Sequence, residues 1–400
     1  MDRQAGGFTV SIRIAWLIRG DETFGVAQAV RGLAGAVAKL GTGVLILALK
    51  EGAFATECRQ AGMEVNTLAL PLPAVPAGGF YRKATAYRRL QKYHRVVAPT
   101  IEKALADKNV QILHVLWPNL MPLAGAVAAR LGIPCFWEMP NAIGSTIPFG
   151  LGRRFFQRSA ATFGIHVLAN SRYTAATFGD WPVRPVVLYP GVDEERFDPA
   201  RFRPFSRLEL GLPPNCVTLG MLGRIEASKG QDIALDAMVP IAREHQLHLV
   251  IVGTETDDQH FSTRLRTIAE TAGIPERLHI VGATAHPEQM IPAVDIAVSA
   301  TPGPEAFGLS VVEAMMMAKP VLAHASGGPA ETVVDGLTGW HVRSARANAM
   351  QAALRRAVAD RPRWPAMGAA GRRRALAHFS LRRQAEQYLT LVRQALVRQP

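Results

Sequence analysis

Residues 217–242 read VTLGMLGRIEASKGQDIALDAMVPIA, and this stretch decides the fold. An apolar run at 217–222 leads into a polar loop that carries Arg224 and Lys229, and apolar residues then recur at helical spacing. A run that is apolar at nearly every position is typical of a strand covered on both faces of a parallel sheet. The stretch therefore predicts a strand, a loop and a helix over Lys229–Ala242, as in an α/β fold.

The same alternation of apolar runs and helix-like stretches extends along the whole chain. A polar, proline-containing stretch around 198–214 separates two such series. We therefore expect two Rossmann-like domains in tandem, facing each other across a deep ligand-binding cleft. The expected strands are Val10–Ile18, Gly43–Leu49, Val65–Leu70, Val110–Leu116, Ile133–Trp137, Gly164–Ala169, Val186–Tyr189, Val217–Leu222, Leu247–Val252, Leu278–Val281, Ile296–Ser299 and Val321–Ala323.

The composition agrees with two folded domains. A chain of 400 residues with 48% hydrophobic residues can form two cores of usual size. Cys58, Cys135 and Cys216 are far apart and show no C-x-x-C spacing, so neither a disulfide framework nor a zinc site is indicated. Charges or prolines interrupt the apolar segments 8–18 and 110–137. We therefore expect a cytoplasmic protein without a signal peptide or a membrane-spanning helix.

Arg224 and Lys229 lie where the strand at 217–222 ends. Two cations in such a loop can clamp a diphosphate, because Arg offers a planar fork of donors and Lys a point charge. Alternatively, both are solvated loop charges. These residues alone do not decide between the two interpretations.

A second informative stretch covers residues 299–342 and reads SATPGPEAFGLSVVEAMMMAKPVLAHASGGPAETVVDGLTGWHV. Residues 308–310 open a predicted helix, whose free amide groups and positive end suit a phosphate. Glu305 lies at the mouth of this helix and Glu313 about one turn inside, where two carboxylates can accept hydrogen bonds from paired sugar hydroxyls. The simpler alternatives are a surface position for Glu313 and a charge that complements the helix dipole for Glu305. Residues 327–328 form another predicted strand-to-helix turn, for which a plain tight turn without a ligand contact is at least as good an interpretation.

Four motifs in this order and spacing resemble the retaining glycosyltransferases of family 4, which have the GT-B fold. They are GRIEASKGQD (223–232), EAFGLSVVEAM (305–315), PVLAHASGGPAETV (320–333) and DGLTGW (335–340). Weaker matches cover nearly the whole chain. The resemblance implies an acceptor-side domain over 1–195, a donor domain over 196–378, and a C-terminal helix over 379–400 that packs back on the first domain.

The resemblance also implies roles for individual residues. Arg224 and Lys229 hold the donor diphosphate, Glu313 binds the ribose hydroxyls, and Glu305 contacts the transferred sugar. Gly25, in the loop after the first strand, lets the backbone approach the phosphates, although a glycine needed only for the turn is an equal alternative. The other expected donor contacts are Gly223, Gly308, Leu309 and Ser310.

The chain departs from the family at the end of the strand CFWEMPN. Many relatives have a histidine there that contacts the donor sugar, whereas this chain has Met139 and Pro140. Glu138 and Asn141 are neighbours that could replace it, but solvated loop positions are the better expectation for both. His114 lies in an apolar strand, where a lone histidine is more often a core residue than a catalyst.

The expected reaction uses no metal and no cofactor. No Asp-x-Asp pair occurs in the chain, so a metal clamp has no visible ligands, and the two cations and a helix end would neutralise the diphosphate. The resemblance implies transfer with retention of anomeric configuration by front-face attack, without a covalent protein nucleophile. The donor is expected to be a UDP-, GDP- or ADP-sugar and the acceptor a bacterial surface polysaccharide, lipopolysaccharide or lipid-linked glycan.

A basic stretch, YRKATAYRRLQKYHRVV, covers residues 81–97. Its apolar residues recur at helical spacing on one stripe, and the remainder is basic. This pattern suits an anionic membrane surface, with a solvated helix as the alternative. The basic residues are Arg82, Lys83, Arg88, Arg89, Lys92 and Arg95, and Arg153, Arg154 and Arg158 add a weaker second patch.

Two other functions remain as alternatives. A sugar-nucleotide epimerase shares the fold, although the spacing of Glu305 and Glu313 matches transferases better. The net charge of +13 and pI near 10.2 also suit a nucleic-acid-binding protein. The chain has neither an aromatic and basic single-strand platform nor a recognition-helix motif, so nucleic acid is not the expected partner.

Overall fold

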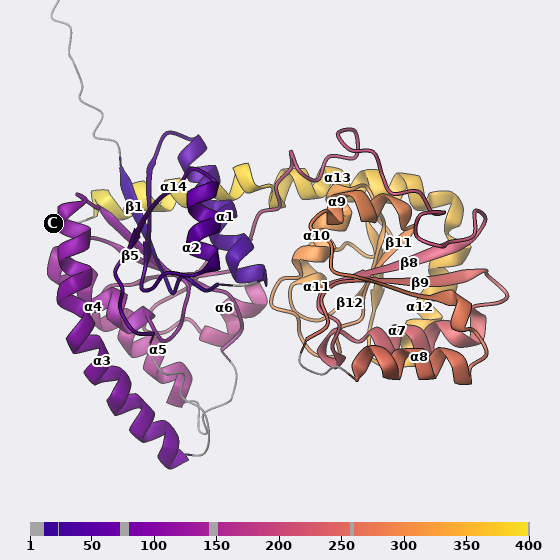
Figure 1. Ribbon diagram of the computed structural model, residues 1–400, viewed down its shortest axis with the longest axis horizontal. Helices are drawn as coiled ribbons and strands as arrows, with labels where there is room; N and C mark the ends of the chain where they lie inside the picture. The colour runs from indigo at the N-terminus through magenta and orange to yellow at the C-terminus, as the bar shows by residue number, and fades with distance from the viewer. Residues whose placement is uncertain (1–11, 23, 73–79, 144–150, 257–259, 399–400) are drawn as a thin grey trace, which may run out of the picture. The chain divides into compact units, whose positions relative to one another are not determined.

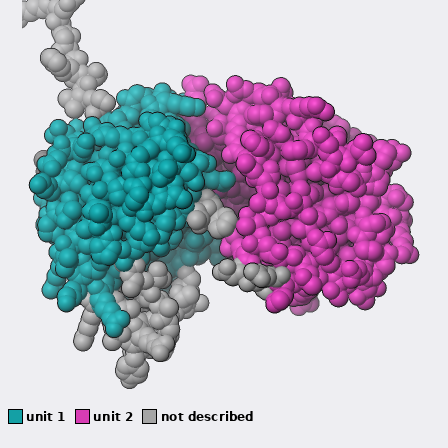
Figure 2. All heavy atoms as spheres, in the orientation of Figure 1, with its two compact units in different colours: residues 1–188, 384–400 teal, residues 189–383 magenta. Residues whose placement is uncertain are grey.

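The computed structural model describes residues 12–22, 24–72, 80–143, 151–256 and 260–398. The chain forms two compact units, shown in separate colours in Figure 2. Unit 1 is built from residues 1–188 and 384–400, and unit 2 from residues 189–383. The chain thus changes unit after residues 188 and 383, whereas the family resemblance implied domain boundaries after 195 and 378.

Unit 1 is a parallel sheet covered by helices on both faces (Figure 1). Its strand order is β3-β2-β1-β4-β5-β6-β7, which contains the 3-2-1-4-5-6 order of a Rossmann-like sheet. The strands are β1 Arg13–Ile18, β2 Gly43–Ala48, β3 Glu64–Thr67, β4 Ile112–Val115, β5 Cys135–Met139, β6 His166–Ala169 and β7 Val186–Val187. The helices are α1 Phe24–Lys39, α2 Ala53–Gln60, α3 Phe80–Asp107, α4 Met121–Leu131, α5 Leu151–Thr162, α6 Arg172–Phe178 and α14 Leu381–Val397.

Each face of the unit 1 sheet has its own core. Helices α3 and α4 bury their apolar residues against one face, around Trp137 and Phe178. Helix α1 packs on the other face together with α14, whose Tyr388, Leu389 and Val392 are buried. The prediction that the C-terminal helix packs back on the first domain is therefore confirmed.

Unit 2 repeats the architecture with six parallel strands in the order β10-β9-β8-β11-β12-β13. One core joins β8, β9 and α7 with α8 and α12, and a second lies under α10 and α13. The strands are β8 Val217–Leu222, β9 Leu247–Val252, β10 Leu278–Gly282, β11 Ile296–Ser299, β12 Val321–His324 and β13 Gly339–Val342. The helices are α7 Gln231–Met238, α8 Phe261–Thr271, α9 Pro287–Met290, α10 Leu309–Met316, α11 Pro329–Thr332, α12 Ala347–Ala359 and α13 Trp364–Phe379.

The structure confirms the two parallel α/β sheets and corrects two details of unit 2. Strand β13 was not predicted, because it has four residues and includes Gly339 and His341. The helix expected from Lys229 begins at Gln231, because residues Ala227–Lys229 form a separate 3-10 turn that ends at Gly230. Among the described residues, no helix combines the length and the apolar character needed to cross a membrane.

Candidate functional site

The sheet order of unit 2 brings two predicted site loops together. Strand β8 has β9 and β10 on one side and β11 on the other. The order of the parallel strands therefore reverses between β8 and β11. Ligands of open α/β sheets bind at such a switch point, beyond the carboxyl ends of the two strands. Here these ends lead into the loop with Arg224 and Lys229 and the loop with Glu305.

Lys229 and Glu305 form an ion pair across this switch point. Lys229 Nζ donates to Glu305 Oε2 at 2.9 Å, and the Thr301 hydroxyl donates to the same oxygen at 3.1 Å. The side chains of Lys229 and Glu305 are 27% and 22% exposed, so a ligand can still reach both. The sequence suggested separate roles for these residues and predicted neither their contact nor the part played by Thr301.

Glycines allow the loops to come this close. A Cβ atom on Gly230 would lie 2.1 Å from the carbonyl oxygen of Ala300, and one on Gly327 would lie 2.0 Å from that of Glu305. Both glycines have positive φ, 70° and 73°. The Gly328 amide donates to the same Glu305 carbonyl at 2.8 Å. Gly327 and Gly328 are therefore more than a tight turn, since they hold the backbone of Glu305 in place.

Helix α10 begins beside this pair. Gly308 precedes it with φ of 86°. In the described part of the chain, the amide groups of Leu309 and Ser310 donate to no protein acceptor. Free amide groups at the positive end of a helix attract anions. The local geometry thus suits the phosphate role expected for residues 308–310.

Glu313 lies in the second turn of α10 and is partly buried. Burial raises its pKa to about 7, with a lowering contribution from Arg196 and a further raising one from Glu288. Arg196 Nε in turn donates to Glu288 at 3.0 Å. Within the described residues, the Glu313 carboxyl group has no hydrogen-bond partner, so it can accept hydrogen bonds from ligand hydroxyls.

Arg224 is more exposed than Lys229 and points to a different carboxylate. Its guanidinium lies 3.0 Å from Glu226 Oε2, and 43% of its side chain is exposed. Sequence analysis did not single out Glu226. Gly223 precedes this residue with φ of 142°, and its carbonyl leaves no room for a Cβ atom on Gly253, which would lie 1.7 Å away. Both predicted cations therefore belong to one loop, each beside its own acid.

In unit 1, the sequence had pointed to Gly25 and to the neighbourhood of Met139. Gly25 lies in the first turn of α1 and not in the preceding loop. It is exposed, and a Cβ atom added to it would have no neighbouring atom within 4 Å. Unit 1 by itself therefore does not require glycine there. Met139 is fully buried at the end of β5 and cannot take the place of a surface histidine.

The expectation of a solvated loop position for Glu138 is wrong. Glu138 lies on β5 with 3% exposure, and its carboxylate is 3.3 Å from His114 Nε2. His114 Nδ1 makes a 2.9 Å hydrogen bond with the Tyr388 hydroxyl of α14. His114 is therefore a core residue, as predicted, and this buried polar group joins α14 to the sheet. Asn141 is exposed.

Unit 1 has its own switch point, between β1 and β4. Two residues there, Glu22 and Trp117, were not predicted from the sequence. Glu22 accepts hydrogen bonds from the amides of Arg19 and Gly20, at 2.6 and 2.8 Å, and from Trp117 Nε1 at 2.9 Å. The Arg19 guanidinium lies over the Trp117 ring, 4.9 Å from its centroid. Their positions directly after β1 and β4 were the signal that could have identified them.

The predicted basic helix is only partly described. The side chains of Arg82, Lys83 and Arg88 lie outside the described residues. Arg89, Lys92 and Arg95 are exposed on α3. The second patch, Arg153, Arg154 and Arg158, is exposed on α5.

The fold defines a Rossmann-like α/β protein of the GT-B type. Residues 202–374 match the family described as Glycosyl transferases group 1, and residues 24–191 match the Glycosyl transferase 4-like domain. Together these matches cover most of the chain, which belongs to the group 1 glycosyl transferases.

Individual relatives agree with this family. The lipopolysaccharide core biosynthesis mannosyltransferase LpsB of Rhizobium meliloti is 30% identical over 55% of this chain and 62% of its own length. The GDP-mannose-dependent alpha-(1-6)-phosphatidylinositol monomannoside mannosyltransferase of Mycolicibacterium smegmatis is 33% identical over 53% of this chain and 58% of its own. The chain thus matches about three fifths of these relatives. A glycosyltransferase structure from Rickettsia africae shares the fold, with TM-score 0.83, 19% identity and coverage of 97% of this chain and 100% of that one.

Proposed function

We propose that this chain transfers a sugar from a nucleoside diphosphate sugar to a hydroxyl group of a glycan or lipid-linked acceptor. The observation that carries the proposal is the grouping of Lys229, Glu305 and the start of α10 at the switch point of unit 2, with the unpartnered carboxyl group of Glu313 in the next turn. A cation and free amides suit the diphosphate, and the carboxyl groups suit hydroxyls. Family membership supports the same reaction class.

The proposed step proceeds with retention and without a metal. The bond between the anomeric carbon and the diphosphate oxygen breaks, and the acceptor oxygen bonds to that carbon on the same face. The acceptor proton passes to the leaving phosphate oxygen. Lys229, Arg224 and the amides of α10 stabilise the negative charge that develops on the diphosphate. When the diphosphate takes the Lys229 ammonium, Glu305 is released to contact the transferred sugar.

A screen against UDP-, GDP- and ADP-sugars tests the reaction and names the donor. GDP-mannose is the first member, because both relatives described above are named as mannosyltransferases and one as GDP-mannose-dependent. Mass spectrometry should detect release of one nucleoside diphosphate, and the same rate should persist in EDTA. Proton NMR of the product should show the anomeric configuration of the donor. An altered donor sugar with no released diphosphate would instead indicate an epimerase, and turnover of no member would contradict the proposal.

We further propose that the chain works in lipopolysaccharide or surface polysaccharide synthesis at the inner face of the bacterial membrane. The exposed Arg89, Lys92 and Arg95 support contact with anionic lipid headgroups. Sedimentation with vesicles of phosphatidylglycerol and phosphatidylcholine tests this contact. Binding should require the anionic lipid and weaken as salt is raised.

A further inference from the structure

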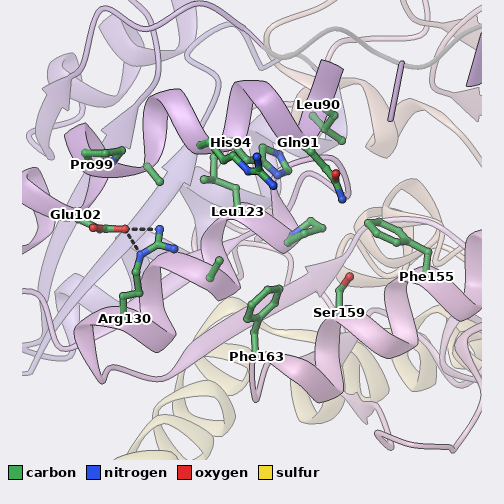
Figure 3. Close-up of a pocket in the computed structure, with 14 residues that line it drawn as sticks. Leu90, Gln91, His94, Pro99, Glu102, Leu123, Arg130, Phe155, Ser159 and Phe163 are labelled. Carbon is green, nitrogen blue, oxygen red and sulfur yellow. Dashed lines mark hydrogen bonds and ion pairs between the residues drawn. The ribbon is translucent and has the colours of Figure 1, made fainter. Parts of the chain in front are cut away.

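Three helices of unit 1 enclose a groove that none of the proposed donor residues lines. Helix α4 packs against both α3 and α5. The groove over it has a volume of about 440 Å³, within the range of small-molecule pockets (Figure 3). The lining residues recur about one turn apart on each helix, so the groove follows the helices.

The inside of the groove is mainly apolar. Its apolar lining includes Leu90, Ala98, Leu123, Ala126, Phe155 and Phe163. Of its polar lining residues, Arg130, Glu102 and His94 have protein partners. Arg130 pairs with Glu102, as Figure 3 shows, and His94 Nε2 lies 3.1 Å from the Asn119 carbonyl oxygen. None of the described lining residues holds a buried polar atom without a partner, so the groove offers contact to a hydrocarbon more than to a polar ligand.

The helices that form the groove carry many exposed cations. Across the sequences of α3, α4 and α5, the acidic residues are Glu102 and Asp107, and Glu102 is neutralised by Arg130. In the described part of the chain, the exposed cations of α3 and α5 make no ion pair. They include Arg89, Lys92 and Arg95 on α3 and Arg153, Arg154 and Arg158 on α5, and Arg95 is the one among them that lines the groove. Arginine binds phosphate through two parallel hydrogen bonds, so Arg95 and the basic surface of these helices complement an anionic headgroup.

We infer that the groove binds one acyl chain of an anionic membrane phospholipid, with the lipid phosphate held by Arg95 and the exposed cations of α3 and α5. An apolar interior beside a cluster of cations matches the two chemical parts of such a lipid. The inference rests on the membrane contact proposed above and gives that contact a defined site. It does not depend on the identity of the donor.

The test uses the full-length protein and phosphatidylcholine vesicles that contain phosphatidylglycerol with a diazirine in the middle of one acyl chain. After sedimentation and photolysis, mass spectrometry should place crosslinks on residues 90–99, 122–130 and 155–163. Ala126 is half-buried in the groove, so Ala126→Trp should fill it and lower crosslinking at least fivefold. Ala129→Trp is the matched control, because Ala129 is exposed on the same helix outside the lining and should leave crosslinking unchanged. Melting temperatures confirm that both variants fold.

The basic surface is tested separately. Combining Arg153→Gln, Arg154→Gln and Arg158→Gln should weaken sedimentation severalfold and keep the crosslink positions of the protein that still binds. Sedimentation without crosslinks on the three helices would overturn the groove assignment and leave the surface contact intact. Failure to sediment would overturn both, while donor turnover would still report on the transferase proposal. Dimerisation abolished by Ala126→Trp, with no lipid crosslinking, would assign the groove to a second copy of the chain and overturn the inference.

Discussion

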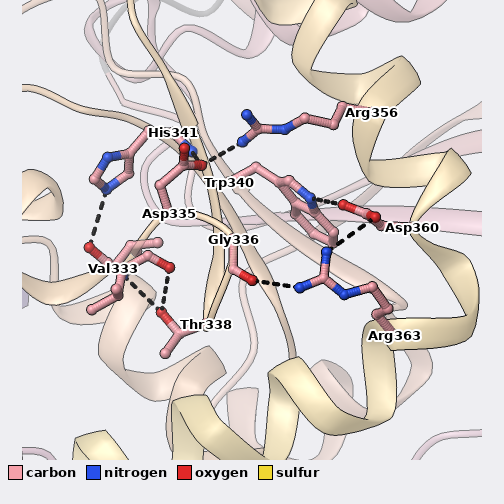
Figure 4. A network of polar contacts seen from close by, with 10 residues as sticks. Val333, Asp335, Gly336, Thr338, Trp340, His341, Arg356, Asp360 and Arg363 are labelled. Atoms are coloured by element: carbon pink, nitrogen blue, oxygen red, sulfur yellow. Dashed lines mark hydrogen bonds and ion pairs between the residues drawn. The ribbon is translucent and has the colours of Figure 1, made fainter.

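Two polar regions of unit 2 come from neighbouring stretches of sequence and have different properties. At the switch point, Lys229 and Glu305 pair with each other, and Glu313 keeps a carboxyl group without a protein partner in the described part of the chain. In the turn that leads into β13, the polar groups hold one another (Figure 4). Trp340 Nε1 donates to Asp360 at 2.8 Å, and Asp335 accepts from the His341 amide at 2.8 Å and pairs with Arg356.

Motifs of the same family therefore contain two kinds of residue: those at the switch point, which have groups available to a ligand, and those in the turn, which stabilise the fold. The motif DGLTGW belongs to the turn, where Arg363 also donates to the Gly336 carbonyl at 2.8 Å and lies 3.3 Å from Asp360. Such a network stabilises a chain reversal, because its polar groups are already paired with one another. Resemblance to a family identifies candidate ligand-binding residues and fold-stabilising residues together. The contacts in the structure distinguish the two.

The largest expected effect is the loss of activity in Lys229→Ala. The diphosphate loses a cation, and Glu305 is left without its ammonium partner. We expect kcat/KM to fall by about 10² to 10³. The free energy of unfolding should change by less than about 1 kcal/mol, because the pair is partly exposed. Arg356→Ala removes a comparable cation from the turn and should keep kcat/KM within about twofold. Equal losses in steady-state assays of both variants would remove the distinction between the two regions.

Two glycines with similar backbone angles give the next largest effect. Gly327 has φ of 73° and its Cβ would meet the Glu305 carbonyl, whereas Gly336 has φ of 74° and open space around a Cβ. Gly336→Ala should cost about 1 kcal/mol from the left-handed backbone alone. Gly327→Ala should cost about 3 kcal/mol or more and lower activity, since Glu305 must move. Urea unfolding and donor turnover measure both effects, and similar costs would show that the close approach has no importance.

The contributions of the two regions to the free energy of unfolding should change with pH in opposite directions. Burial raises the pKa of Glu313 to about 7 from an ordinary value of 4.5. The folded state thus binds this proton more tightly, and the stability it contributes is lost as pH rises from about 5 through 7, on the order of 2 kcal/mol. Relative to Glu313→Gln, the wild type should lose free energy of unfolding over this range. A flat difference between the two proteins would contradict the assignment.

The stability contributed by Asp335 should change with pH in the direction opposite to that of Glu313. Burial alone would raise its pKa, but the His341 amide and Arg356 lower the pKa below the ordinary value. Its stabilising contribution is therefore present at neutral pH and is lost as pH falls through the lowered pKa. Relative to Asp335→Asn, the wild type should lose stability in acid, and a loss at high pH would show that the carboxylate is not held by these partners.

The smallest effect is expected for Arg363→Ala. This side chain is 58% exposed, so losing its contacts with Asp360 and the Gly336 carbonyl should cost about 0.5 kcal/mol. Donor turnover should be unchanged within error. Thermal unfolding and turnover measured on one preparation provide the check, and a clear loss of turnover would place the turn in the functional region.

The sequence predicted most of the fold because the apolar runs of buried parallel strands are easy to recognise. It missed β13, whose four residues include a glycine and a histidine. It also misplaced Glu138, because the carboxylate lies beside His114, which is joined in turn to Tyr388 from the far end of the chain. Such contacts depend on tertiary packing, which a local pattern does not contain.

The candidate site was predicted in part. The residues of the two loops were identified, but the pairing of Lys229 with Glu305 was not. The two residues are 76 positions apart, and their contact follows from the adjacency of β8 and β11. Thr301 and Glu226 were missed because a threonine or a glutamate in a polar loop carries no distinct signal.

The most direct test of the central claim is a calorimetric titration of the nucleoside diphosphate released in the donor screen. It compares the wild type with Glu313→Ala, Lys229→Ala and Arg356→Ala. We predict that Kd rises at least tenfold, about 1.4 kcal/mol, in the first two variants and stays unchanged in Arg356→Ala. Equal affinity in all four proteins would contradict the assignment of the switch point of unit 2 as the donor site.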